Sequence, residues 1–169
     1  MNDDGKYECE NLYYISEIDT LIKKQKVDFK HTLSDAILFL LYADRHNTIK
    51  GKTKQMKEVF LVLREVLNNQ SVQPTNFKKN RFGPYGEEVV YTIDQLIFLD
   101  LVSVSGKKTT NAFAIGITSK GIEYIKDRFK ELPYKVQLTL KQKRKDWDNN
   151  KDTRNLGCSR YDEFLEELA

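Results

Sequence analysis

The chain contains few of the side chains from which metal sites and disulfide frameworks are built. Its 169 residues include two cysteines, Cys9 and Cys158, and two histidines, His31 and His46. Because these residues form no CxxC pair and no other zinc-binding spacing, the sequence predicts no metal and no cofactor. A Cys9–Cys158 disulfide is geometrically allowed, but a reducing compartment disfavours it.

Long apolar runs are also absent. No stretch approaches the roughly 18 apolar residues that span a bilayer, and the N-terminal sequence MNDDGKYECE is too acidic for a signal peptide. We therefore expect no membrane association and a cytoplasmic location.

Groups arranged for acid–base catalysis are missing as well. Glu87 and Glu88 are adjacent, so on a helix they point about 100° apart and do not share a proton. Asp44, Arg45 and His46 follow a helical stretch and are typical of a solvated helix end. The sequence therefore predicts a protein that is not an enzyme.

Positive charge is abundant but unevenly distributed. Residues 21–57 carry nine bases and three acids, and residues 101–151 carry twelve bases and five acids. The intervening residues 58–100 carry four bases and six acids. Two basic blocks are the usual electrostatic signature of a nucleic-acid binder, although solvated lysine-rich helices give the same pattern.

The stretch TIKGKTK, residues 48–54, contains the Gly-Lys-Thr end of a nucleotide-binding loop. Such a loop needs a second glycine five positions before Gly51, where this chain has His46, so the interpretation fails. The lysines here instead gather at the expected start of a helix, where backbone N–H groups favour a bound anion such as a DNA phosphate.

Apolar spacing predicts a mainly helical chain. Thr32 and Asp35 have capping-box spacing before a helix that is apolar on every side from residue 36 to 43. Helices are further expected at residues 12–26, 53–67 with Thr53 as N-cap, 84–100 with Pro84 in the first turn, 118–132, 134–148 and 159–168. Between residues 101 and 118 the period changes to two around a Gly-led turn, which indicates a β-hairpin.

The expected fold class is therefore mainly α with a small β-hairpin (α+β). Three core helices, a hairpin and a further helix follow the order of a winged helix-turn-helix domain. We assign residues 1–30 to an N-terminal tail and amphipathic helix, 31–132 to the winged-helix domain with its wing at 101–118, and 133–169 to a basic helix and a short acidic helix.

The segments KGKTKQMKEVFLVL and RFGPYGEE carry a resemblance to a known family. Over about residues 33–131 the chain resembles archaeal and bacterial winged-helix proteins with an aromatic-x-Tyr/Phe-Gly-Pro-Tyr-x-x-Glu segment, which resemble the Panacea-type antitoxin and adaptor domain. The resemblance implies a winged-helix fold and either a regulatory or a protein-binding role.

The leading hypothesis is a DNA-binding transcriptional regulator. The expected reading helix, residues 84–100, has four acids and no lysine or arginine, so arginine-to-guanine contacts are excluded there. Phosphate contacts must come from other segments, while the wing explores the minor groove. The candidate DNA-binding residues are Lys50, Lys52, Lys54, Lys57, Lys78, Lys79, Arg81, Lys107 and Lys108, and the expected partner is double-stranded DNA. The basic run KQKRK, residues 141–145, is expected to add to this surface.

The alternative is an adaptor of antitoxin type that holds a basic protein partner. Its candidate contacts are Phe82, Tyr85, Glu87 and Glu88. For Phe82 and Tyr85 a structural role is also open, in which both rings fasten the start of the helix to the core. In either case a homodimer through the terminal helices is expected.

Overall fold

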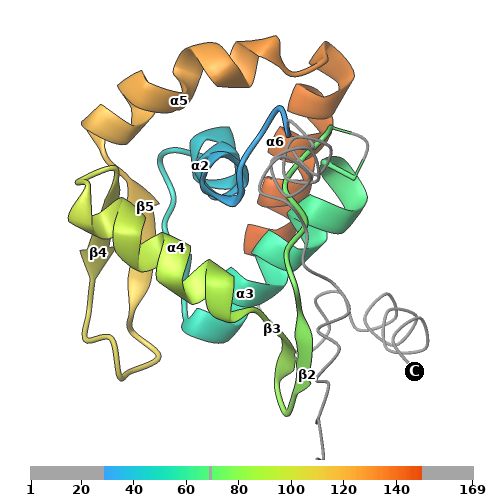
Figure 1. Cartoon of the computed structure of the whole chain (residues 1–169). Helices are drawn as coiled ribbons and strands as arrows, with labels where there is room; N and C mark the ends of the chain where they lie inside the picture. Colours follow the sequence, from blue (N-terminus) through green and yellow to red (C-terminus); the bar gives the residue numbers. More distant parts are fainter. Residues whose placement is uncertain (1–28, 69, 150–169) are drawn as a thin grey trace, which may run out of the picture.

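The structure, a computed structural model, describes residues 29–68 and 70–149, and these form an α+β fold (Figure 1). The class expected from the sequence is confirmed: helices dominate and the sheets are small and antiparallel. The helices expected at 12–26 and 159–168, and both cysteines, lie outside the described residues. The elements are α2 (Leu33–Ala43), β1 (Ile49–Lys50), α3 (Lys52–Leu61), η1 (Val62–Val66), β2 (Lys78–Asn80), β3 (Gly83–Tyr85), α4 (Glu87–Phe98), β4 (Val102–Ser105), β5 (Ala114–Ile117), α5 (Ser119–Glu131) and α6 (Tyr134–Asn149).

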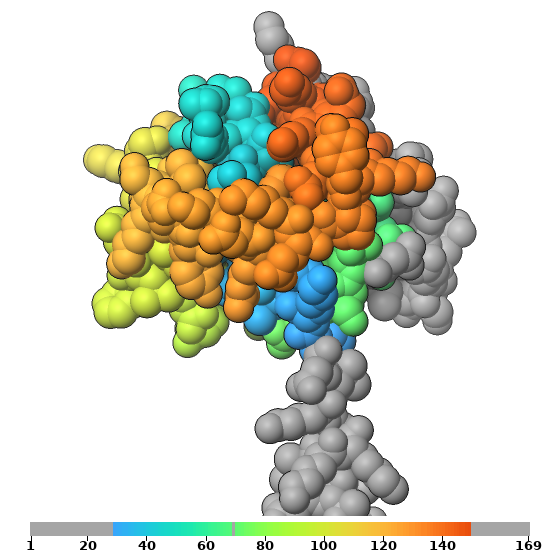
Figure 2. Space-filling view, turned by 90° about the horizontal axis from the view of Figure 1, so that it is seen from above, coloured from blue at the N-terminus to red at the C-terminus, as the bar shows by residue number. Residues whose placement is uncertain are grey.

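Helix α2 is the centre of the core, as its uniformly apolar sequence predicts. Its residues from Ala36 to Leu41 are buried, and α3, α4, α5 and α6 all pack against it. The predicted capping box is confirmed: the Asp35 backbone N–H donates to the Thr32 hydroxyl, and the Thr32 N–H donates to the Asp35 carboxylate. Figure 2 shows α5, in orange, spread over one face of the molecule so that little of α2 is visible.

The predicted hairpin is β4–β5, and it belongs to a larger sheet. Strand β5 pairs antiparallel with β4 on one side and with the short strand β1 on the other, giving the order β1-β5-β4. Strand β1, which sequence periodicity did not predict, is two residues long. Because it pairs with β5, it places the start of α3 beside the β4–β5 hairpin.

Helix α3 begins at Lys52, and its N-cap is Gly51, two residues before the predicted N-cap Thr53. Gly51 has φ 85° and its N–H donates to the Phe113 carbonyl, so a backbone conformation and a cross-strand bond fix this start instead of a side-chain cap. The predicted helix continues to its expected end near Leu67, but its last turn widens into the π-helix η1.

Residues 68–83, which separate the helices expected at 53–67 and 84–100, contain half of a second hairpin. Strands β2 and β3 pair antiparallel, with Lys78 opposite Tyr85 and Asn80 opposite Gly83. Pro84 therefore lies in a strand, and the prediction that it occupies the first turn of a helix is wrong. Helix α4 begins at Glu87 after Gly86, whose N–H donates to the Met56 sulfur at 3.3 Å.

Helix α6 returns to the core after α5 ends. Leu140 and Trp147 are buried, and the helix packs on α2 and η1. The interpretation of residues 141–145 as part of an exposed basic surface is wrong for Arg144, which is 0% exposed. The reason is an acidic partner on α3, which draws this guanidinium inward.

Candidate nucleic-acid interface

Three basic segments that are far apart in the sequence meet at one end of the molecule. The tips of the β2–β3 and β4–β5 hairpins extend toward the same edge in Figure 1, with the start of α3 between them. We call this region, made of residues 50–54, 78–82 and 107–111, the hairpin end. Lys52 of α3, Phe82 of the first hairpin and Lys108 of the second line one shared cavity of about 240 Å³.

A second, more polar depression adjoins that cavity. It has a volume of about 370 Å³ and is lined by residues 50–54 of α3 and its N-cap and by residues 108–111 of the β4–β5 hairpin. Lys52, Thr53 and Lys108 line both depressions. The hairpin end therefore combines an apolar hollow with a cationic groove.

Five of the nine predicted contact residues are exposed and available for an anion. Lys50, Lys79 and Lys107 make no ion pair within the described part of the chain. Lys52 lies over the Phe113 ring at 6.0 Å and Arg81 over the Phe82 ring at 5.4 Å. These ring contacts leave both charges unneutralised, so all five residues contribute to a positive surface.

Lys78 and Lys108 are exposed but already paired with carboxylates of α4. Lys78 lies 3.5 Å from Glu87, and Lys108 donates to both carboxylate oxygens of Asp94 at 2.6 Å. Exposed ion pairs of this kind contribute roughly 0–1 kcal/mol. An incoming phosphate can therefore replace either carboxylate at little cost.

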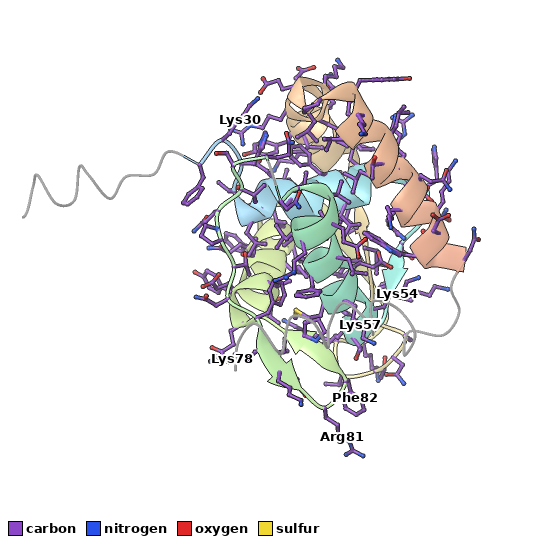
Figure 3. All side chains as sticks on the ribbon, turned by 90° about the vertical axis from the view of Figure 1, so that its right-hand side faces the viewer. Lys30, Lys54, Lys57, Lys78, Arg81 and Phe82 are labelled. Carbon is purple, nitrogen blue, oxygen red and sulfur yellow. The ribbon has the colours of Figure 1, made fainter. Side chains whose placement is uncertain are left out.

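The prediction of a DNA contact is wrong for Lys57, which is buried, whereas Lys54 is half-buried and paired with carboxylates where it lines the second depression. Lys57 is only 6% exposed, and a Cβ added at Gly83 would lie 2.7 Å from its Cε, which places the hairpin backbone directly on this side chain. Lys54 lies 3.2 Å from Asp148 of α6 and 3.5 Å from Glu58. In Figure 3 both lysines lie well back from Arg81 and Phe82, which project from the hairpin tip.

The physical reason for this error is that α3 is covered on more than one side. The spacing of Met56, Val59 and Phe60 predicts a single buried face. The β2–β3 hairpin and α6 cover two further sides, and Lys57 and Lys54 face these elements.

Lys54 is part of a buried ionic cluster that joins α3 to α6. The Arg144 guanidinium lies 3.5 Å from Glu58 and pairs with Asp148 one turn along α6. Burial raises the pKa of Glu58 to about 7, although Arg144 and Lys54 favour its charged form. The cluster holds the start of α3 against the last turn of α6 and so stabilises one side of the hairpin end.

The residues proposed for a protein partner are also exposed. Phe82 is 64% exposed at the tip of the β2–β3 hairpin, Tyr85 lies on the outer side of β3, and Glu87 and Glu88 occupy the first turn of α4. Phe82 therefore does not fasten the helix start to the core. That role falls to Phe77, whose ring lies 3.3 Å from a Cβ built at Gly86 and packs edge-on against Phe60.

Two further residues of the cavity were not singled out from the sequence. Phe113, just before β5, forms an apolar wall, and Asn80 lines the side near the hairpin turn. Strand alternation could have identified Phe113, because it shares a buried face with Ile115. Asn80 and Gly83 stand on either side of Arg81-Phe82. Both are common turn residues, and this pattern could have predicted a hairpin turn here.

In the described part of the chain no group of three or more histidine, cysteine, aspartate or glutamate side chains could hold a metal ion. None of the helices described is both long and apolar enough to cross a bilayer. Comparisons with protein-family models, with curated proteins and with solved structures find no match to this chain. Function must therefore be argued from the geometry of the hairpin end.

Proposed function

We propose that the protein is a winged-helix DNA-binding module that holds phosphates with the hairpin end, and that it acts in transcriptional regulation. The observation that carries the proposal is that Lys50, Lys52 and Lys108 line one depression formed by the start of α3 and the β4–β5 hairpin. Exposed Lys107 precedes Lys108 in the chain, and exposed Lys79 and Arg81 stand on either side of Asn80, which lines the adjoining cavity. Phosphate contacts of this type supply most of the sequence-independent affinity for DNA.

The topology supports the winged-helix part of the proposal. The order is α2, β1, α3, η1, β2, β3, α4, β4 and β5, so the β2–β3 hairpin is inserted between α3 and α4, and β1 joins the β4–β5 hairpin in one antiparallel sheet. In this frame α4 takes the place of a reading helix. Its sequence carries Glu87, Glu88 and Asp94 and no cation, so contacts by the flanking hairpins agree better with its chemistry than insertion into a groove.

The test is binding of the full chain to a fluorescent DNA duplex at several salt concentrations. Five phosphate contacts predict a log–log slope of affinity against salt of about −4.5. Lys50→Glu with Arg81→Glu should weaken binding strongly and flatten the slope by about 1.8, since two contacts are lost.

A matched control has the same change of charge elsewhere. Lys30 and Lys135 are exposed and lie outside the hairpin end, and Figure 3 shows Lys30 at the opposite end from Arg81. Lys30→Glu with Lys135→Glu should leave most of the affinity in place. Equal losses in the two double variants would mean that only net charge matters and that no interface exists at the hairpin end.

The adaptor role stays a second candidate because of the outer face of α4. Tyr91 is 66% exposed and Phe98 88% exposed, and they lie on the same side of the helix, two turns apart. Exposed aromatic residues flanked by Glu88 suit a basic amphipathic partner. Phe98→Ser should then remove a basic protein that co-purifies with the native chain, whereas retention of that protein would argue against this face.

A further inference from the structure

The cavity at the hairpin end has a composition that phosphate binding does not explain. Its walls are built from apolar groups, including Met56, Pro84, Ile93 and Phe113, while Lys52 and Lys108 stand at its edge. A ligand that contacted only the lysines would leave this apolar hollow filled with water. The natural complement is a molecule with a flat apolar part carried on an anionic chain.

The volume narrows the choice of ligand. Pockets for drug-sized molecules usually measure about 300–1,000 Å³. At about 240 Å³ this cavity suits one small ring system. The adjoining cationic depression continues from it without a break in lining residues, since Lys52, Thr53 and Lys108 belong to both.

We propose that the cavity receives one unstacked nucleobase while the neighbouring cations hold the phosphates on either side. The inference rests on the proposed function and names its ligand class: single-stranded or locally unpaired DNA, in preference to an intact duplex. In a duplex the bases are stacked and paired, so a base enters this cavity only after it has left the helix.

Phe82 gives the strongest support from a single side chain. Its ring lines the cavity, yet it is 64% exposed at the hairpin tip, where burial in the core does not account for it. The Arg81 guanidinium lies 5.4 Å from the ring centroid. An aromatic ring beside cations that follow a backbone is the usual platform for single strands, because every base offers a flat face for stacking.

The polar residues of the cavity add groups that can meet the edge of a base. Asn80 lines one side, and the Asp94–Lys108 pair lines another, supplying a carboxylate and an ammonium group that are 2.6 Å apart. A base edge carries donors and acceptors together, so a wall with both kinds of group suits it. These groups can therefore contact a base edge although α4 itself has no lysine or arginine.

The test compares three fluorescent probes with the full chain: an oligothymidine of about 12 nucleotides, an abasic oligomer of the same length, and a duplex of that length. The abasic strand keeps every phosphate and loses every base. The oligothymidine is expected to bind about tenfold or more tightly than the abasic strand, and also more tightly than the duplex.

Two substitutions locate the effect. Phe82→Ala should weaken oligothymidine binding about tenfold and change abasic binding by less than about twofold. Tyr134→Ala, which removes a similarly exposed ring at the start of α6, should change neither. Because Phe82 is exposed, its substitution should leave the unfolding temperature nearly unchanged, and the comparison of probes needs no variant at all.

The outcomes separate this inference from the proposed function. Salt-dependent binding of all three probes with no preference for the oligothymidine over the abasic strand would overturn the base-binding cavity and leave DNA binding intact. Failure of every probe to bind at low salt would overturn the proposed function itself. Selective loss with Phe82→Ala, and with that variant alone, supports both.

Discussion

Replacement of Arg144 by methionine is expected to destabilise the fold by about 3–5 kcal/mol. The guanidinium is fully buried between Glu58 of α3 and Asp148 of α6. Removal of the arginine leaves Lys54, 3.5 Å from Glu58, as the remaining cation for this buried carboxylate, and the reduced compensation accounts for most of the loss. Methionine keeps much of the volume, so a cavity contributes little.

The expected loss depends on pH because Glu58 can give up its charge. Its pKa is about 7 with Arg144 in place, and the loss of a cation must raise it further. At about pH 8 the native chain keeps Glu58 largely ionised and paired with two cations, whereas the variant must bury this charge with Lys54 alone or bind a proton. Below about pH 6 the carboxyl is neutral in both, so the difference should shrink.

The measurement is urea unfolding of the native chain, Arg144→Met, Glu58→Met and the double variant at about pH 6 and pH 8. Replacing both members of a buried pair by apolar residues is often neutral, so the double variant should be more stable than Arg144→Met alone. Lys145→Met is the matched control, because Lys145 is the next residue of α6 and is exposed.

A loss for Arg144→Met within about 0.5 kcal/mol of that for Lys145→Met would refute the reasoning. It would place the arginine in solvent with the rest of residues 141–145, as the basic run by itself suggests. The same result would remove the cluster as a support for the start of α3.

Three other substitutions and conditions test the fold independently. Gly121→Ala should destabilise the fold by about 1–3 kcal/mol in thermal unfolding, because a Cβ there would lie 2.2 Å from the Leu101 carbonyl oxygen. An unchanged unfolding midpoint would mean that α5 does not approach the Leu101 backbone this closely. Asp35→Ala should cost about 1–3 kcal/mol, since it removes the cap of α2 and leaves Arg128, 2.7 Å away, without its carboxylate; an effect no larger than that of a surface alanine would contradict the buried cap. Between about pH 4.5 and 7 the folded chain holds the Glu58 proton more tightly than the unfolded chain, so the free energy of unfolding should fall as pH rises, by up to about 1.4 kcal/mol per pH unit. Glu58→Gln should remove this pH-dependent component. A pH profile of the variant identical to that of the native chain would disprove the raised pKa.

The DNA proposal and the α4 face proposed for a protein partner use different surfaces, although Phe82, a candidate contact of that partner from the sequence, lies at the hairpin end. The cations and Phe82 belong to the hairpin end, while Tyr91 and Phe98 lie on the outer face of α4. Variants on one surface should therefore not affect binding at the other. This separation allows each function to be tested with the same purified chain.

The sequence by itself determined the elements whose signals are local. The cap of α2 comes from Thr32 and Asp35, three residues apart, and the β4–β5 hairpin comes from alternation around a glycine turn. The fully apolar helix had to lie in the centre because no side of it tolerates water. Periodicity and capping act within a few residues, so a linear reading captures them.

Only the tertiary structure decided which charged residues face solvent. The sequence predicts that Lys57 and Arg144 lie on the surface. In the structure the β2–β3 hairpin covers Lys57, and Arg144 is buried in an ion pair with Glu58. Both burials depend on contacts between segments that are distant in the chain, and helical spacing carries no information about them. The cavity beside Phe82 likewise exists only because α3, α4 and two hairpins meet there.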